Sequence, residues 1–144
     1  MSVVNLSPNE AWKILKENSD SLLIDVRTKE EYDFVGFADL TSINSNRSLF
    51  LPWRIYPNMA MNESFTEDLS ILISKIFINH KPKNIDLLFI CRSGGRSMEA
   101  ALFMSDFGYN CYNIIGGFEG AIDSFGHRGT TSSWKAENLP WRQN

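Results

Sequence analysis

The chain has 144 residues, of which 43% are apolar, and a formal net charge of −3 at pH 7. This length and composition suit a single domain over residues 1–144, whose core needs no metal or disulfide staple. The mildly acidic balance argues against a general nucleic-acid surface, which is normally basic. No apolar run is long enough to cross a bilayer, so we expect no membrane partner.

The N-terminal segment and the cysteine count both indicate a reducing compartment. Residues 1–6 lack the basic start, long apolar stretch and cleavage site of a secretory signal. The two cysteines, Cys91 and Cys111, are too few for a disulfide scaffold. They and the two histidines, His80 and His127, also lack the spacing of a zinc site. We therefore expect a cytoplasmic protein that holds no metal and no cofactor.

The first part of the chain alternates strand and helix signals. Residues 3–6 are a short candidate strand, and the capping-box pair Ser7 and Glu10 predicts a helix that runs to about residue 18. Residues 22–26 form a continuous apolar run of strand length. Such a run is typical of a parallel strand that is covered on both faces.

The next segment contains a second capping-box pair and then loses its pattern. Thr28 and Glu31 predict a short helix that ends near Gly36. We expect a strand within residues 38–43. Residues 44–62 show no clear period, so no element is predicted there.

A longer helix and a second buried strand follow. Ser64 and Glu67 have capping-box spacing and precede a stripe of apolar residues at helical spacing. The expected core positions of this helix are Phe65, Leu69, Leu72, Ile73, Ile76 and Phe77. Residues 85–90 are again apolar and of strand length, and they run directly into Cys91.

The last third of the chain predicts one more helix, one more strand and a tail. From Ser97 the helix has a core stripe of Ala100, Phe103, Met104 and Phe107, and Gly108 suits its C-terminal end. Residues 110–115 are expected to form the last strand. The tail, from about residue 125 to 144, should be irregular and partly docked, with Trp134 and Trp141 pinning it to the body. The alternation of strands and helices favours an α/β sheet.

The clearest chemical signal lies where the strand at 85–90 meets the next helix, in the loop Cys91-Arg92-Ser93-Gly94-Gly95-Arg96-Ser97. In α/β proteins the carboxyl end of a parallel strand is where sites are built, and the helix start adds unpaired N–H groups and a positive dipole end. The two glycines let successive N–H groups turn inward as an anion-binding nest. Together with the two arginines, this setting favours Cys91 as a nucleophilic thiolate.

A plainer interpretation is a buried cysteine that precedes a glycine turn and a helix cap. A structural turn has no use for two flanking arginines and a serine, so we favour the chemical role. Cys111 has no such surroundings. It alternates with Asn110 and Tyr112 in the expected strand, and we interpret it as a small buried apolar residue rather than a resolving thiol.

The loop resembles the active-site loop of the rhodanese-like sulfurtransferases, in their single-domain bacterial form. Other segments match the family in order along the chain. Leu23-Ile24-Asp25-Val26-Arg27 followed by Glu30-Glu31-Tyr32 is similar to its first signature. Ile115-Gly116-Gly117-Phe118 and the stretch from Trp134 to Trp141 resemble its C-terminal signatures.

The resemblance implies a rhodanese fold, an α/β architecture with a five-stranded, mainly parallel sheet flanked by helices on both faces. It also implies that Cys91 takes a sulfane sulfur from thiosulfate or a related donor, and passes it as a persulfide to a thiol or other nucleophile. Backbone N–H groups from Arg92 to Ser97 would cradle the outer sulfur. Asp25, Arg27 and Glu31 are expected to brace the strand–helix junction rather than take part in the chemistry.

Two features depart from the family pattern. Members commonly carry Gly-His after the second helix, where this chain has Gly36-Phe37. Residues 44–62 are also longer than the family minimum, and their effect on access to the site is open. Within them, Trp53, Arg54 and Tyr56 either line the mouth of the site or pack a surface loop.

Two alternative functions share features of this sequence. A cysteine phosphatase or arsenate reductase shares the strand–loop–helix arrangement, but only four residues separate Cys91 from Arg96, and phosphatase loops are one residue longer. A residue adds up to ~3.8 Å of contour, so the shorter loop suits a single sulfur rather than a phosphate. A rhodanese module that only binds a partner or relays sulfur stays open, because a retained cysteine does not prove turnover.

Overall fold

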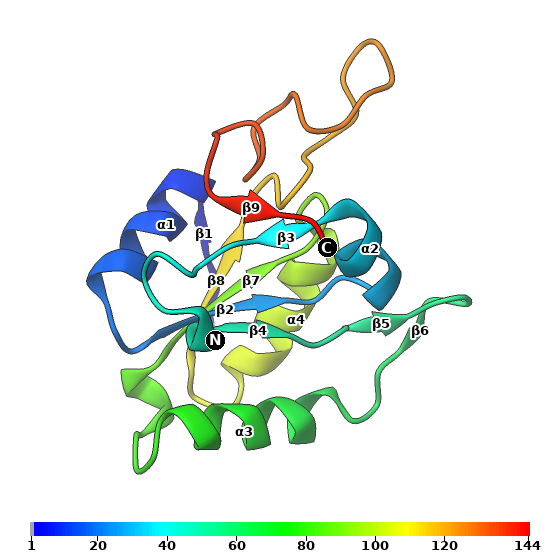
Figure 1. Cartoon of the computed structure of the whole chain (residues 1–144). Coiled ribbons are helices and arrows are strands. Elements are labelled where there is room, and N and C mark those ends of the chain that lie inside the picture. Colours follow the sequence, from blue (N-terminus) through cyan, green and yellow to red (C-terminus); the bar gives the residue numbers. More distant parts are fainter. Residues whose placement is uncertain (1) are drawn as a thin grey trace.

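The computed structural model describes residues 2–144, and its centre is a parallel β-sheet (Figure 1). The strand order is β1-β8-β7-β2-β4, and every neighbouring pair is parallel. This confirms the predicted five-stranded sheet. Its strands are β1 (Val4–Leu6), β2 (Ser21–Asp25), β4 (Ser48–Phe50), β7 (Asp86–Ile90) and β8 (Asn110–Ile114).

Helices cover both faces of the sheet, as predicted. One core cluster packs α3 (Phe65–Ile76) and α4 (Gly95–Ser105) against side chains such as Leu22 and Phe89. The other packs α1 (Pro8–Glu17) against the opposite face, beside Leu23. Adjacent residues of β2 thus enter different cores, which explains why its sequence is continuously apolar.

Two of the three expected capping boxes are present. Ser7 caps α1 and Thr28 caps α2 (Lys29–Val35), each with its glutamate partner. The box expected at Ser64 is wrong, because its hydroxyl makes no cap hydrogen bond and instead lies 2.9 Å from both Asn62 Oδ1 and Asp68 Oδ2. With ψ near 6°, its backbone is also far from the extended form of an N-cap.

The segment after α2 differs from the prediction. Only β3 (Phe37–Ala38) is extended near residues 38–43, and it pairs antiparallel with β9 (Trp141–Arg142) outside the main sheet. The edge of the main sheet is instead β4, which lies in the stretch where no element was predicted. That stretch also forms a hairpin of β5 (Arg54–Ile55) and β6 (Ala60–Met61).

A buried arginine explains how so short an edge strand is anchored. Arg47 ends the 3₁₀ helix η1 (Ser45–Arg47) immediately before β4. Its guanidinium donates to Leu15 O at 2.7 Å, Asn18 O at 3.1 Å and Ser21 O at 3.0 Å. A cation therefore satisfies the free carbonyls at the C-terminal end of α1 and fixes the start of β4 beside β2.

The C-terminal third follows the prediction except for the core stripe of its helix and for a short strand in the tail. Ala100 and Met104 of α4 are buried, but Phe103 is 45% exposed and Phe107, in the turn after α4, is 49% exposed, so the expected core stripe is only half correct. A second 3₁₀ turn, η2 (Pro82–Asn84), precedes β7. The tail is mostly turns and bends, but β9 makes it part of a two-stranded sheet. Within residues 2–144, no helix is long and apolar enough to cross a membrane.

Candidate active site

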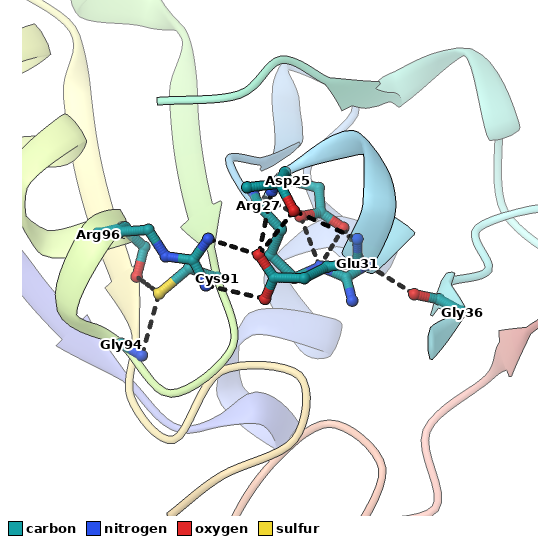
Figure 2. A network of polar contacts seen from close by, with 9 residues as sticks. Asp25, Arg27, Glu31, Gly36, Cys91, Gly94 and Arg96 are labelled. Carbon is teal, nitrogen blue, oxygen red and sulfur yellow. Dashed lines mark hydrogen bonds and ion pairs between the residues drawn. The ribbon is translucent and has the colours of Figure 1, made fainter. Parts of the chain in front are cut away.

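Cys91 lies between the end of β7 and the start of α4, where the sequence predicts it. Its side chain is only 1% exposed. Gly94 N donates a hydrogen bond to Cys91 Sγ at 3.1 Å (Figure 2). Gly94 has a φ of 115°, which glycine adopts without strain and which turns its N–H towards the sulfur. The first turn of α4 adds N–H groups that have no acceptor within the helix.

A hydrogen-bond chain lies behind the sulfur. Ser97 Oγ is 3.2 Å from Cys91 Sγ and donates to Asn113 Oδ1 at 2.5 Å. Asn113 Nδ2 in turn donates to Asn5 Oδ1 at 3.2 Å. The sequence predicts Ser97 at the site but not Asn113, which is 3% exposed in β8. A polar residue at a buried strand position was the available signal.

A glycine-rich turn after β8 makes backbone hydrogen bonds to the other side of the active-site loop. Phe118 N donates to Cys91 O at 2.8 Å, and both Glu119 N and Gly120 N donate to Arg92 O. Gly117 has a φ of 61°, and a Cβ there would lie 2.4 Å from Cys91 O. The backbones of the two loops therefore touch, and only glycine fits at this position.

The two arginines of the loop have different surroundings. Arg96 donates to both carboxylate oxygens of Glu31, at 2.6 and 2.9 Å (Figure 2). Arg92 is exposed, and within residues 2–144 no carboxylate lies within ion-pair distance of it. Arg96 thus belongs to an ion pair, whereas Arg92 faces solvent.

The carboxylate of Glu31 is strongly held in its charged form. Burial raises its pKa, but hydrogen bonds and the charge of Arg96, together with Thr28, outweigh burial and lower the pKa to about 2. The hydrogen bond with Glu31 correspondingly raises the pKa of Arg96. This pair joins the first turn of α2 to the first turn of α4.

Asp25 and Arg27 form a second, fully buried pair next to the site. Arg27 Nε is 2.9 Å from Asp25 Oδ1, and Arg27 Nη2 is 2.7 Å from Asp25 Oδ2. Nη2 also donates to Gly36 O at 2.6 Å, and the guanidinium lies 4.5 Å from the ring centroid of Phe118. Arg27 therefore links the end of β2, the end of α2 and the turn after β8 that contacts the active-site loop.

A hollow of about 340 Å³ adjoins the loop, lined by Thr28, Glu30, Glu31, Tyr56, Met59, Arg92 and Arg96. Of the three aromatic and basic candidates at 53–56, only Tyr56 lines it. Trp53 is buried against Phe65, and Arg54 pairs with Glu99 at 3.5 Å. The β5–β6 hairpin therefore contributes one wall of the approach to the site.

The remaining candidate groups lie away from this chemistry. Cys111 is buried, and burial raises the pKa of its thiol to about 12, which suits the predicted apolar role. His80 and His127 are exposed. In the part of the chain that the structure describes, no group of three or more His, Cys, Asp or Glu side chains could hold a metal ion.

A cysteine in a glycine-rich loop between a parallel strand and a helix, on this sheet, defines the class of protein. The chain belongs to the rhodanese-like domain family, whose model matches residues 7–123.

A sequence relative and two solved structures illustrate the similarity of this chain to known proteins. A Rickettsia rickettsii protein called "uncharacterized protein RP600 homolog" is 40% identical and covers 99% of both chains. The crystal structure of Rv0390 from M. tuberculosis is 34% identical, with a TM-score of 0.84 and 100% of both chains covered. The polysulfide-sulfur transferase homodimer of Wolinella succinogenes has a TM-score of 0.61 at 23% identity, over 99% of this chain and 80% of that chain, and supports the fold alone.

Proposed function

We propose that the protein is a rhodanese-type sulfurtransferase in which Cys91 carries sulfur as a persulfide. The observation that carries this proposal is the position of Cys91 Sγ at the N-terminal end of α4, 3.1 Å from Gly94 N. N–H groups and a positive helix end favour negative charge on the sulfur. Family membership and the four-residue spacing from Cys91 to Arg96 support sulfur over phosphate as the transferred group.

The proposed reaction has two balanced steps. The Cys91 thiolate attacks the outer sulfur of thiosulfate or a related anion, forming an S–S bond while the bond to the central sulfur breaks. Sulfite leaves with that electron pair. An acceptor thiolate then attacks the outer sulfur of the persulfide, becomes a persulfide itself and releases the Cys91 thiolate. Small-molecule and protein thiols both have the necessary chemistry.

The surrounding residues have distinct proposed roles. Backbone N–H groups from Arg92 to Ser97 stabilise the negative charge on the outer sulfur. Arg92, which is exposed and has no carboxylate partner among residues 2–144, attracts the donor anion. Arg96 shapes the loop through Glu31, and Asp25 and Arg27 hold the end of β2.

Sulfite release from thiosulfate in the presence of a small thiol tests the proposal. The wild-type protein should release sulfite catalytically, and Cys91→Ser should reduce the rate to background while retaining the fold. Cys111→Ser is the matched control and should retain the activity, because that thiol is buried with a pKa of about 12. Full activity in Cys91→Ser would contradict the persulfide role.

The 1% exposure of Cys91 favours one alternative, a rhodanese module that binds a partner without turning over sulfur. Such a protein would bind its partner equally well with Ser at position 91 and release no sulfite. The sulfite measurement therefore separates the two functions directly.

A further inference from the structure

The single proton of the Ser97 hydroxyl cannot be donated to Cys91 Sγ and to Asn113 Oδ1 at the same time. A serine has one O–H donor and two acceptor sites. In the structure the hydroxyl donates to Asn113 Oδ1, so towards Cys91 it can only accept from the thiol. A thiolate or persulfide at Cys91 has no such proton to give. In that state the best arrangement turns the Ser97 hydroxyl towards the sulfur.

An amide at position 113 permits both arrangements. Turning the Asn113 amide over would place its NH₂ group on Ser97 Oγ and leave the Ser97 proton free for the sulfur. Its oxygen would then face Asn5, whose own amide can donate after the same turn. No atom of the backbone moves. The chain Cys91–Ser97–Asn113–Asn5 therefore has two self-consistent hydrogen-bond directions.

We infer that Asn113 is a positioning residue, whose amide orients the Ser97 hydroxyl as an acceptor for the Cys91 thiol and as a donor to the sulfur anion. Asn113 is buried, and a hydrogen bond to an anion is strong where water is excluded. The direction of the Ser97 hydrogen bond should therefore affect the reactivity of Cys91. This inference rests on the proposed function for its meaning in sulfur transfer. Its effect on the reactivity of Cys91 is testable without any sulfur donor.

The test is the rate of alkylation of Cys91 by iodoacetamide as a function of pH, on the full chain. Asn113→Ala should slow alkylation at pH 7 by roughly 3–10-fold, because the Ser97 hydroxyl is no longer oriented. Asn113→Asp keeps the size and the acceptor but cannot donate when ionised, and it adds negative charge near the sulfur. Its alkylation profile should move to higher pH by about one pH unit.

A double-mutant cycle separates this role from a structural one. If Asn113 acts through Ser97, Asn113→Ala should change the alkylation rate by less than ~2-fold in a Ser97→Ala background. Asn110→Ala is the matched control, because Asn110 lies at the other end of β8 and bonds to Lys83 O and Asp86. It should leave the profile unchanged. Additive effects of the Ser97 and Asn113 substitutions would overturn the inference, and so would an unshifted profile in folded Asn113→Asp.

The charged groups on the active-site loop and on the segments packed against it stay the same in all these variants, so a shift belongs to position 113. They come from the loop, β2, α2 and the turn after β8, and they are Arg92, Arg96, Asp25, Arg27, Glu31 and Glu119. Thermal unfolding of each variant shows whether it is folded. A protein that alkylates as described but releases no sulfite would contradict the proposed function and leave the role of Asn113 intact.

Discussion

At the residue scale, the loop is held by ion pairs and by hydrogen bonds to the backbone, although Arg27 Nη1 is buried without a partner among residues 2–144. Arg27 and Arg96 each bind a carboxylate through two nitrogens, which fixes direction as well as charge. The sequence predicted Arg27 as a support for the site and Arg96 as part of its anion-binding loop, because the family motif marks both residues. It did not separate Arg92 from Arg96, because the partner of Arg96 is Glu31 on α2, 65 residues earlier in the chain.

Stability in acid should depend on Glu31. Its pKa of about 2 lies below the ordinary 4.5, so its stabilising effect is complete above pH 4.5 and is lost as the pH falls towards 2. Glu31→Gln should lower the free energy of unfolding at pH 7 by roughly 1–3 kcal/mol. The difference from the wild type should shrink as the pH falls through that window. Urea unfolding at several pH values measures it.

The exposed neighbour Glu30 provides the matched control for this prediction. Glu30→Gln should leave the unfolding free energy within about 0.5 kcal/mol of the wild type at every pH. A Glu31→Gln deficit that is the same at pH 3 and pH 7 would show that the charge of Glu31 does not matter.

The two loop arginines should respond differently to truncation. Arg92→Ala should raise the KM for thiosulfate by about 5–10-fold and leave thermal stability unchanged, because it removes one exposed cation. Arg96→Ala should lower thermal stability as well, because it leaves the Glu31 carboxylate without its partner. Steady-state sulfite release and thermal unfolding report the two effects, and an unchanged KM in Arg92→Ala would contradict the role of that residue.

At the scale of elements, the sequence predicted the helices and strands whose signals lie within a few neighbouring residues. The strand β2, the strand β7 and the capped helices α1 and α2 follow from apolar runs and capping boxes within a few residues. The strands β3, β4 and β9 are only two or three residues long, and β3 pairs with a partner about a hundred residues away. The strand predicted within residues 38–43 overlaps β3 only at Ala38, and no local signal marked β4 or β9. Asn113 was missed for the same reason, since its partners lie on β1 and α4.

A substitution in the turn after β8 should reduce activity, because this turn contacts the active-site loop directly. Gly117→Ala puts a Cβ 2.4 Å from Cys91 O and 2.7 Å from the carbonyl carbon of Arg92. We expect it to lower sulfite release at least ~10-fold by displacing the loop. Gly126→Ala is the control, because it has a similar positive φ of 80° but no atom within 4 Å of the added Cβ. Equal activities in the two variants would contradict the contact.

At the scale of the whole molecule, the C-terminal tail closes the face that α1 leaves open. Trp134 is fully buried, with its ring 5.9 Å from that of Trp12, and its Nε1 donates to Pro140 O at 2.7 Å. Further on, β9 pairs with β3 beside α2 (Figure 1). The tail thus reaches the helix whose Glu31 supports the active-site loop.

Removing the buried tryptophan should therefore cost more than removing its neighbour. Trp134→Ala should lower the free energy of unfolding by about 3–5 kcal/mol, as for other large buried side chains. Trp141 is 36% exposed, and its replacement by Ala should lower it by less than half as much. Chemical denaturation of both variants measures the difference. Similar losses would contradict the view that Trp134 is the main anchor of the tail.

The most direct test of the central claim is the intact mass of the protein after incubation with thiosulfate and removal of the excess. A persulfide on Cys91 predicts a mass increase of one sulfur atom in the wild type and in Cys111→Ser, lost on adding a small thiol. Cys91→Ser should show no increase. An unmodified wild-type protein, or an added sulfur that persists in Cys91→Ser, would contradict the assignment of Cys91 as the sulfur carrier.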